Sequence, residues 1–183
     1  MAYNMKDVFY LDTSINSTTS AGDGIQTLDL SSYVDPIARG RSKGTGLAIY
    51  KVHFDFSNLA DNAPVPAASA GTARVGIISS PGVQSAAVNS ATLTAGILAS
   101  SNDLMIAGMD FYAGATAAGD PSPYMYLKPS KEVPYVVVRD QVALMVDIST
   151  GFTANTLISV RLECAQVTLD QSTLNQLLRT QTV

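Results

Sequence analysis

Residues 134–169 constrain the fold more than any other stretch, because they hold two long runs of alternating apolar and polar residues. Within 141–150, the apolar side chains that recur at every second position are Val142, Leu144, Val146 and Ile148. Within 157–169, they are Ile158, Val160, Leu162 and Cys164. A period of two places such side chains on one face of a β-strand. Because Gly151 and Asn155 bracket a turn between the runs, the sequence predicts a β-hairpin with one buried face.

The remaining strands are predicted at 8–15, 25–34, 47–56, 74–80 and 124–127, between segments rich in Gly, Pro, Asn and Asp. The cleanest alternation lies in 47–56. There we expect one apolar face made of Ala48, Tyr50, Val52, Phe54 and Phe56, and an opposite polar face made of Lys51, His53 and Asp55.

Residues 84–119 are dense in Ala, Ser, Thr and Gly, and predict one or two strands plus a surface excursion. A helix through 85–98 is the alternative, although Gly96 weakens it. Near the C-terminus, Asp170 is expected to cap a short helix that carries Leu174, Leu177 and Leu178. About eight strands in one domain, 1–183, predict an all-β, antiparallel sandwich or barrel with a short C-terminal helix.

Charged side chains make up only 14% of the 183 residues, against about 25% in an average soluble domain. Such a surface costs little free energy to desolvate, which favours extensive burial against other proteins. The formal net charge of −4 argues against a dedicated nucleic-acid-binding protein, which normally carries a basic face. No apolar run is long enough for a signal peptide or a membrane span, so we expect synthesis in a cytoplasm without export.

The sequence predicts no catalytic, cofactor-binding or metal site. His53 is the only histidine, and we expect it at the surface or in an interface. Cys164 is the only cysteine and is expected to be a buried thiol. One His and one Cys fall short of a zinc ligand set. Loop aspartates such as Asp61 and Asp120 leave a calcium site open, but lack EF-hand spacing.

Two short motifs resemble functional ones without matching them. Asp12-Thr13-Ser14 differs from the Asp-Thr-Gly of aspartic proteases at its third residue. The basic loop at 37–46, with Arg39, Arg41 and Lys43, lacks the phosphate-binding Gly-x-x-x-x-Gly-Lys spacing and precedes a strand, not a helix. We expect this loop to be flexible, with a contact to a neighbouring subunit, a membrane surface or a genome as its functional alternative.

A small, all-β chain that is poor in charge and has no catalytic set resembles the single jelly-roll capsid proteins of icosahedral viruses. The resemblance covers about residues 7–169 and rests on strand number and composition. It implies a self-assembling coat subunit of a virion, with copies of itself and in some cases a second coat protein as partners. It also implies that 1–6 and 170–183 are extended arms that interlock neighbouring subunits.

Capsid proteins that package naked nucleic acid often carry a basic terminal arm. The first 38 residues of this chain contain one basic residue, Lys6, and the last 20 contain only Arg179. We therefore expect a shell that does not condense the genome itself and is separated from it by an internal membrane or another protein. The alternatives are a carbohydrate- or receptor-binding module of a spike or fibre, and a subunit of a β-rich filament.

Overall fold

The computed structural model describes residues 8–17, 22–35, 43–65, 71–79, 97–113 and 122–181. These parts form nine strands and one helix, α2, Gln171–Thr180. In chain order the strands are β1 Phe9–Ser17, β2 Gly22–Asp29, β3 Lys43–Asn58, β4 Gly71–Ile78, β5 Met105–Ala113, β6 Ser122–Leu127, β7 Tyr135–Val137, β8 Gln141–Thr150 and β9 Thr156–Asp170.

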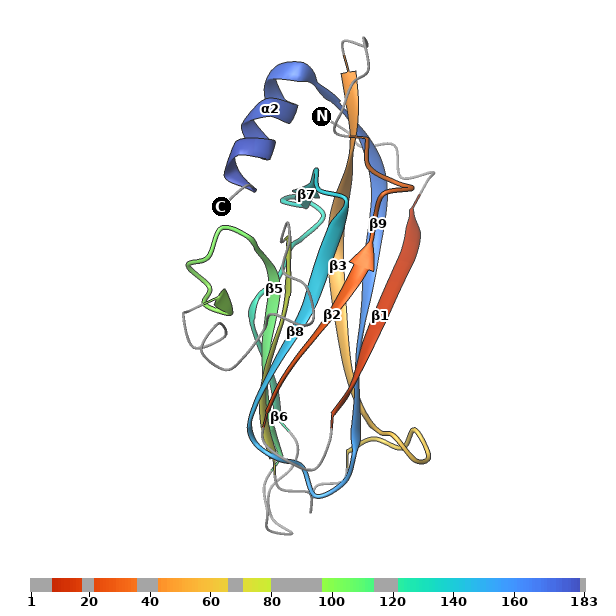
Figure 1. Cartoon of the computed structure of the whole chain (residues 1–183), viewed down its shortest axis with the longest axis vertical. Helices are drawn as coiled ribbons and strands as arrows, with labels where there is room; N and C mark the ends of the chain where they lie inside the picture. Colours follow the sequence, from red (N-terminus) through yellow and green to blue (C-terminus); the bar gives the residue numbers. More distant parts are fainter. Residues whose placement is uncertain are drawn as a thin grey trace.

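The strands form two antiparallel sheets that face each other (Figure 1). Sheet A has the order β1-β9-β3-β7, and sheet B has the order β2-β8-β4-β5-β6. Apart from the run β4-β5-β6, successive strands of the chain pass from one sheet to the other, so most neighbours in a sheet are distant in sequence. This arrangement of two four-stranded sheets, with β6 added at one edge, is a jelly roll. The predicted all-β, jelly-roll-like sandwich is confirmed.

The predicted hairpin at 134–169 is wrong in its pairing, although both of its strands exist. β8 pairs with β2 and β4 in sheet B, whereas β9 pairs with β1 and β3 in sheet A. The connection between them therefore crosses from sheet to sheet. Each strand already has two neighbours in its own sheet, so neither has a free edge for the other.

One face of β3 also differs from the prediction, because the strand bulges between Ile49 and Lys51. A bulge inserts one extra residue and reverses the alternation beyond it. Leu47 and Ile49 therefore join Val52 and Phe56 in the core between the sheets. Ala48 and Tyr50 were expected on that face, but form a separate small cluster with Ala165.

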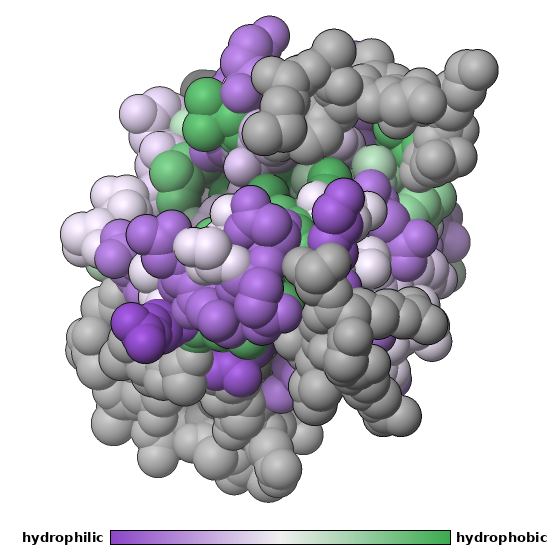
Figure 2. All heavy atoms as spheres, turned by 90° about the horizontal axis from the view of Figure 1, so that it is seen from above, coloured by the Kyte–Doolittle hydropathy of each residue, from purple (hydrophilic) through white to green (hydrophobic). Residues whose placement is uncertain are grey.

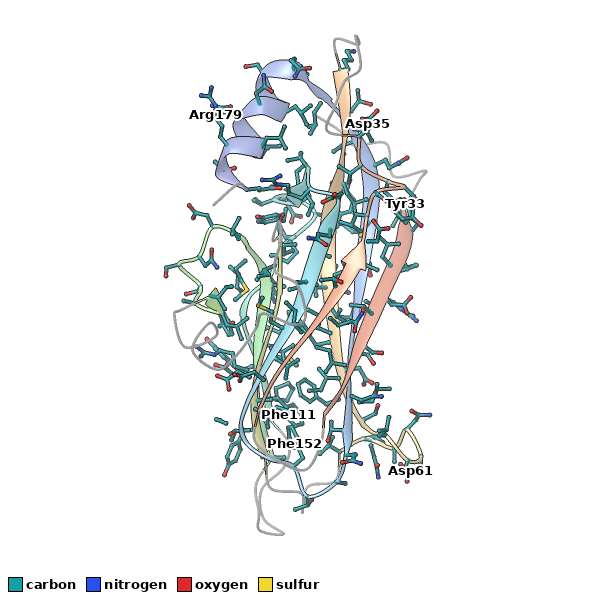
Figure 3. The ribbon with its side chains drawn as sticks, in the orientation of Figure 1. Tyr33, Asp35, Asp61, Phe111, Phe152 and Arg179 are labelled. Carbon is teal, nitrogen blue, oxygen red and sulfur yellow. The ribbon has the colours of Figure 1, made fainter. Side chains whose placement is uncertain are left out.

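The core lies between the sheets and takes alternate side chains from both. Three aromatic rings fill one end of it, as Figure 3 shows for Phe111 and Phe152. The Phe56 and Phe111 rings stack with centroids 4.2 Å apart, and Phe152 meets Phe111 at 5.9 Å. Phe152 comes from the connection between β8 and β9, so this cluster joins both sheets to the crossover between them.

The C-terminal helix α2 begins as predicted, with Asp170 Oδ1 accepting a hydrogen bond from the Thr173 N–H at 2.7 Å. α2 sits at one end of the sandwich (Figure 1), and Leu174 is fully buried. In this chain, residues 170–181 therefore fold against their own domain. The predicted arm at 1–6 lies outside the described residues, and interlocking by either end stays a prediction.

Phe111→Ala is expected to lower the free energy of unfolding by about 3–5 kcal/mol, because it removes a ring packed against two others. Tyr112→Ala is the matched control. It is the next residue along β5 and points outward, with its side chain 54% exposed. We expect its cost to be below about 1 kcal/mol. Urea unfolding followed by far-UV circular dichroism measures both, and equal costs would contradict the assigned faces of β5.

Candidate interaction surfaces

The outer face of sheet A carries most of the charged side chains of its strands. Register aligns them in rows across β1, β9 and β3: Asp12 is opposite Arg161, which is opposite His53, and Tyr10, Glu163 and Lys51 form the next row. We call this the polar face. A shallow hollow of about 660 Å³ lies over it.

His53 lies on the polar face as predicted, with its side chain 43% exposed. Its Nε2 is 2.9 Å from Glu163 Oε1. The hydrogen bond from His53 holds the pKa of Glu163 below its ordinary value, with a smaller contribution from Lys51. Among the described residues, His53 is thus part of a surface interaction with a carboxylate.

The Asp12-Thr13-Ser14 motif lies in the middle of β1. Thr13 pairs with Val160 of β9, and the run is regular strand throughout. An aspartic-protease site requires a tight turn at these positions, whereas residues 12–14 are extended strand. Within the described residues, no group of three His, Cys, Asp or Glu side chains is placed to hold a metal ion.

The outer face of sheet B carries a second set of polar groups. One row crosses all five strands: Asp23, Asp147, Arg74, Asp110 and Tyr124 are opposite one another in that order. Arg74 forms a bidentate ion pair with Asp110, at 2.7 Å from Nε to Oδ1 and 2.8 Å from Nη2 to Oδ2. The Arg74 guanidinium also lies 5.0 Å from the centre of the Tyr126 ring, in a cation–π contact.

Two exposed tyrosines adjoin this row. Tyr112 of β5 is 54% exposed and Tyr124 of β6 is 67% exposed. They border an open hollow of about 530 Å³, together with Arg74, Asp110 and Asp147. We call this surface the tyrosine face. Large, amphipathic tyrosine side chains are enriched where protein surfaces bind one another.

Two carboxylates meet at the other end of the same row. Asp23 and Asp147 are opposite each other in β2 and β8. Partial burial, followed by the negative charge of Asp147, raises the pKa of Asp23 above its ordinary value. Removing more water from this edge would therefore favour the protonated form of Asp23.

The tyrosine face covers only one half of the sheet B exterior, because a segment of the chain packs on the other half. Leu98 contacts a cluster made of Ile78, Met105, Ala143 and Met145. The Tyr126 hydroxyl donates a hydrogen bond to the Leu98 carbonyl at 2.7 Å, and burial raises the Tyr126 pKa to about 12. The tyrosine face is therefore bordered by side chains, among them Leu98 and Tyr126, that are packed against the rest of sheet B.

Sequence reasoning missed the polar network around Gln181, at the end of α2. This residue is 3% exposed, and its side chain bonds to the main chain at Val136 and Val138 and to Ser79. Nothing local in the sequence signals it, because a single Gln in a polar tail is expected in solvent. Seen from this end of the molecule, hydrophilic side chains occupy much of the described surface, with hydrophobic ones between them (Figure 2).

Several candidates from the sequence cannot be placed on these surfaces. In the basic loop, Arg39 and Arg41 lie outside the described residues, and so does Asp120. Asp61 accepts a hydrogen bond from the Ala63 N–H at 3.0 Å in a turn of its own. Among the described segments, no helix has the length and apolar character needed to cross a membrane.

Comparisons by sequence found no matching family model and no matching curated protein. Comparisons by structure found VP1 of Merkel cell polyomavirus, in complex with disialyllactose, at a TM-score of 0.50 and 6% identity. That match covers 93% of this chain and 98% of the other. VP1 of human polyomavirus 7, as a pentamer, aligns at a TM-score of 0.48 and 9% identity, over 93% of this chain and 98% of the other.

The likeness at a TM-score of 0.50 concerns the fold. The chain has a jelly-roll fold similar to that of a viral capsid protein. The predicted resemblance to jelly-roll capsid proteins is therefore confirmed at the level of architecture. At 6% identity, no ligand-binding residue of the polyomavirus protein is transferred to this chain.

Cys164 is expected to resist thiol reagents while the chain is folded. Its side chain is fully buried in β9, and burial raises its pKa to about 12, which leaves almost no reactive thiolate near neutral pH. Labelling with Ellman's reagent should proceed at least about a hundredfold more slowly in buffer than in concentrated guanidinium chloride. Since it is the only cysteine, the signal has one source. Rapid labelling of the native chain would contradict its placement.

Proposed function

We propose that this protein is a structural subunit of a virion, which assembles with copies of itself into the closed shell of an icosahedral virus. The observation that carries the proposal is the sheet topology, β1-β9-β3-β7 against β2-β8-β4-β5-β6, in a chain whose surface is poor in charge. The first feature gives the architecture of a coat subunit. The second lowers the free-energy cost of covering large areas with neighbouring copies.

The tyrosine face is the surface that we propose for such a contact. Tyr112 and Tyr124 offer large contact area with few rotatable bonds, so ordering them costs little entropy. Arg74 and Asp110 already neutralise each other in a bidentate pair. Burying a pair that is already formed leaves neither Arg74 nor Asp110 as an uncompensated charge.

The shell is proposed not to condense the genome. Among described residues, the outer faces of the two sheets carry more acidic than basic groups, as the aligned rows show. Phosphate binding requires several cationic side chains on one surface, because each neutralised phosphate adds to the affinity. An internal membrane or a second coat protein would then lie between the shell and the nucleic acid.

Assembly is tested on the purified protein by size-exclusion chromatography with light scattering and by negative-stain electron microscopy. We expect closed shells, or their pentamers and hexamers, whose absorbance spectrum shows no nucleic acid. Fluorescence polarisation with labelled single- and double-stranded DNA should show no tight binding at physiological salt. A strict monomer at high concentration would contradict the shell, and tight binding would contradict the separation from the genome.

The contact is tested by replacing both exposed tyrosines, Tyr112→Ser with Tyr124→Ser. We expect the variant to keep its melting temperature within a few degrees, because both side chains lie outside the core. Assembly should be weakened at least about tenfold in the concentration it requires. Val133→Ser is the matched control, since Val133 is 73% exposed and is not among the residues that line the hollow of this face. Unchanged assembly of the double variant would contradict the role of the tyrosine face as a contact, but not the proposal that the subunits form a shell.

A carbohydrate-binding module is the second candidate, because the same tyrosines lie beside polar groups around an open hollow. Aromatic faces next to hydrogen-bonding side chains suit the alternating apolar and hydroxylated surfaces of sugars. This function requires a discrete small oligomer and glycan binding that is lost in Tyr124→Ala. Closed shells without any glycan affinity would reject it.

A further inference from the structure

Two glycines lie opposite each other in the middle of sheet B. Gly76 of β4 is paired with Gly108 of β5, and Gly76 shares the outer face of the sheet with Arg74, two residues before it. A Cβ atom at Gly76 would lie 2.8 Å from Leu98 Cδ2, and one at Gly108 would overlap the Tyr126 ring. The absent side chains therefore leave a trough in the outer face, which Leu98 and Tyr126 fill.

A bulge in β6 directs Tyr126 into this trough. Along β5 the pairing advances by one residue, from Gly108 to Met109. Along β6 it advances by two residues over the same step, from Leu127 to Met125. Tyr126 is thus the extra residue, and a bulge reorients the side chain of the residue that it inserts.

The Tyr126 side chain contacts the tyrosine face and the neighbouring segment 97–104 at once. Its hydroxyl donates a hydrogen bond to the Leu98 carbonyl at 2.7 Å, and its ring centre lies 5.0 Å from the Arg74 guanidinium. Arg74 in turn holds Asp110 through two hydrogen bonds. Among the described residues, Arg74 makes no hydrogen bond of its own to segment 97–104. Tyr126 is therefore the link between Arg74 and that segment.

Segment 97–104 is bonded to the sheet differently at its two ends. Near its C-terminal end, the Leu104 carbonyl accepts a hydrogen bond from the main-chain N–H of Ser79 at 2.8 Å. Among the described residues, the Tyr126 hydroxyl makes the one hydrogen bond that joins the first half of the segment to sheet B. That half therefore depends on Tyr126 and on the packing of Leu98.

We propose that Tyr126 is a positioning residue that couples the tyrosine face to segment 97–104. With the ring in the trough, its hydroxyl holds Leu98 and its face supports Arg74; with the ring displaced, both are released together. Coupling of this kind requires an element with two discrete arrangements, and the seated ring supplies it. A neighbouring copy that covers the tyrosine face would then also fix segment 97–104. That consequence rests on the proposed function, whereas the coupling within one subunit does not.

The link to the segment is tested by Tyr126→Phe, which removes the hydroxyl and keeps the ring. Hydrogen exchange of unassembled subunits, followed by mass spectrometry, reports on peptides within 97–104, where the Asn102 amide is bonded inside the segment. We expect exchange there to accelerate at least about fivefold, because a hydrogen bond to the sheet is lost. Tyr124→Phe is the matched control, since it removes an exposed hydroxyl from the same strand and should change nothing. Unchanged exchange in Tyr126→Phe would overturn the link.

The coupling itself is tested by Arg74→Met, which removes the charge over the Tyr126 ring and leaves the sequence of 97–104 as it is. We expect exchange at 97–104 to accelerate about threefold, and to accelerate no further when Arg74→Met is added to Tyr126→Phe. Lys51→Met is the matched control, because it removes a positive charge from the other sheet. Arg74→Gln takes the place of Arg74→Met if that variant does not fold.

No acceleration in the Arg74 variant, or two effects that simply multiply in the double variant, would overturn the coupling. All of these readouts use unassembled subunits, so their failure is distinguishable from a failure to form shells.

Discussion

The register of β9 is the constraint on which the rest of the structure depends. This 15-residue strand pairs with β1 along one side and with β3 along the other. Its inward side chains, Ile158, Val160, Leu162 and Cys164, are at most 1% exposed. A slip of one residue would place Arg161 and Glu163 in the core and expose these apolar groups, so the register is fixed strongly. Through its two ladders, β9 fixes both neighbouring strands as well.

The position of most strands could be predicted from the sequence, whereas their partners could not. The alternation of apolar and polar residues along 141–150 and 157–169 correctly predicts that each strand has one buried face. It does not predict which sheet each strand joins. The turn residues Gly151 and Asn155 suit a tight hairpin and a crossover equally well. The sheet that each strand joins is decided by its two neighbours, which come from distant parts of the chain. Phe152 also contributes, because its side chain is buried in the core and packs the connection between β8 and β9 against the aromatic cluster.

The interaction surfaces could also be predicted only in part, because the sequence pattern gives the faces of one strand but not the partners of that strand. The polar face includes Lys51, His53 and Asp55, which a period of two places together within one strand. Tyr112, Tyr124 and Arg74 come from three strands and meet only once sheet B has formed. The bulge after Ile49 is a further limit, because a single inserted residue moves Ala48 and Tyr50 away from the core without changing the local pattern of residue types. The side chain of Gln181 bonds to residues more than 40 positions away in the sequence.

The polar face and the tyrosine face differ in the free energy needed to remove water from them. The charged side chains of the polar face that form no ion pair with another described residue are Asp12, Arg161, Lys51 and Asp55. Covering them would require matched charges from a partner. On the tyrosine face, Arg74 is already joined to Asp110, and Tyr112 and Tyr124 are exposed beside the pair. The cost on sheet B is concentrated at Asp23, where partial burial, followed by the negative charge of Asp147, raises the pKa of the carboxyl above its ordinary value. Covering that edge would raise the pKa further, so proton uptake would accompany the contact. Low overall charge therefore does not make every surface equally suited to burial. On sheet B, the electrostatic cost of burial is confined to one carboxylate pair, Asp23 and Asp147.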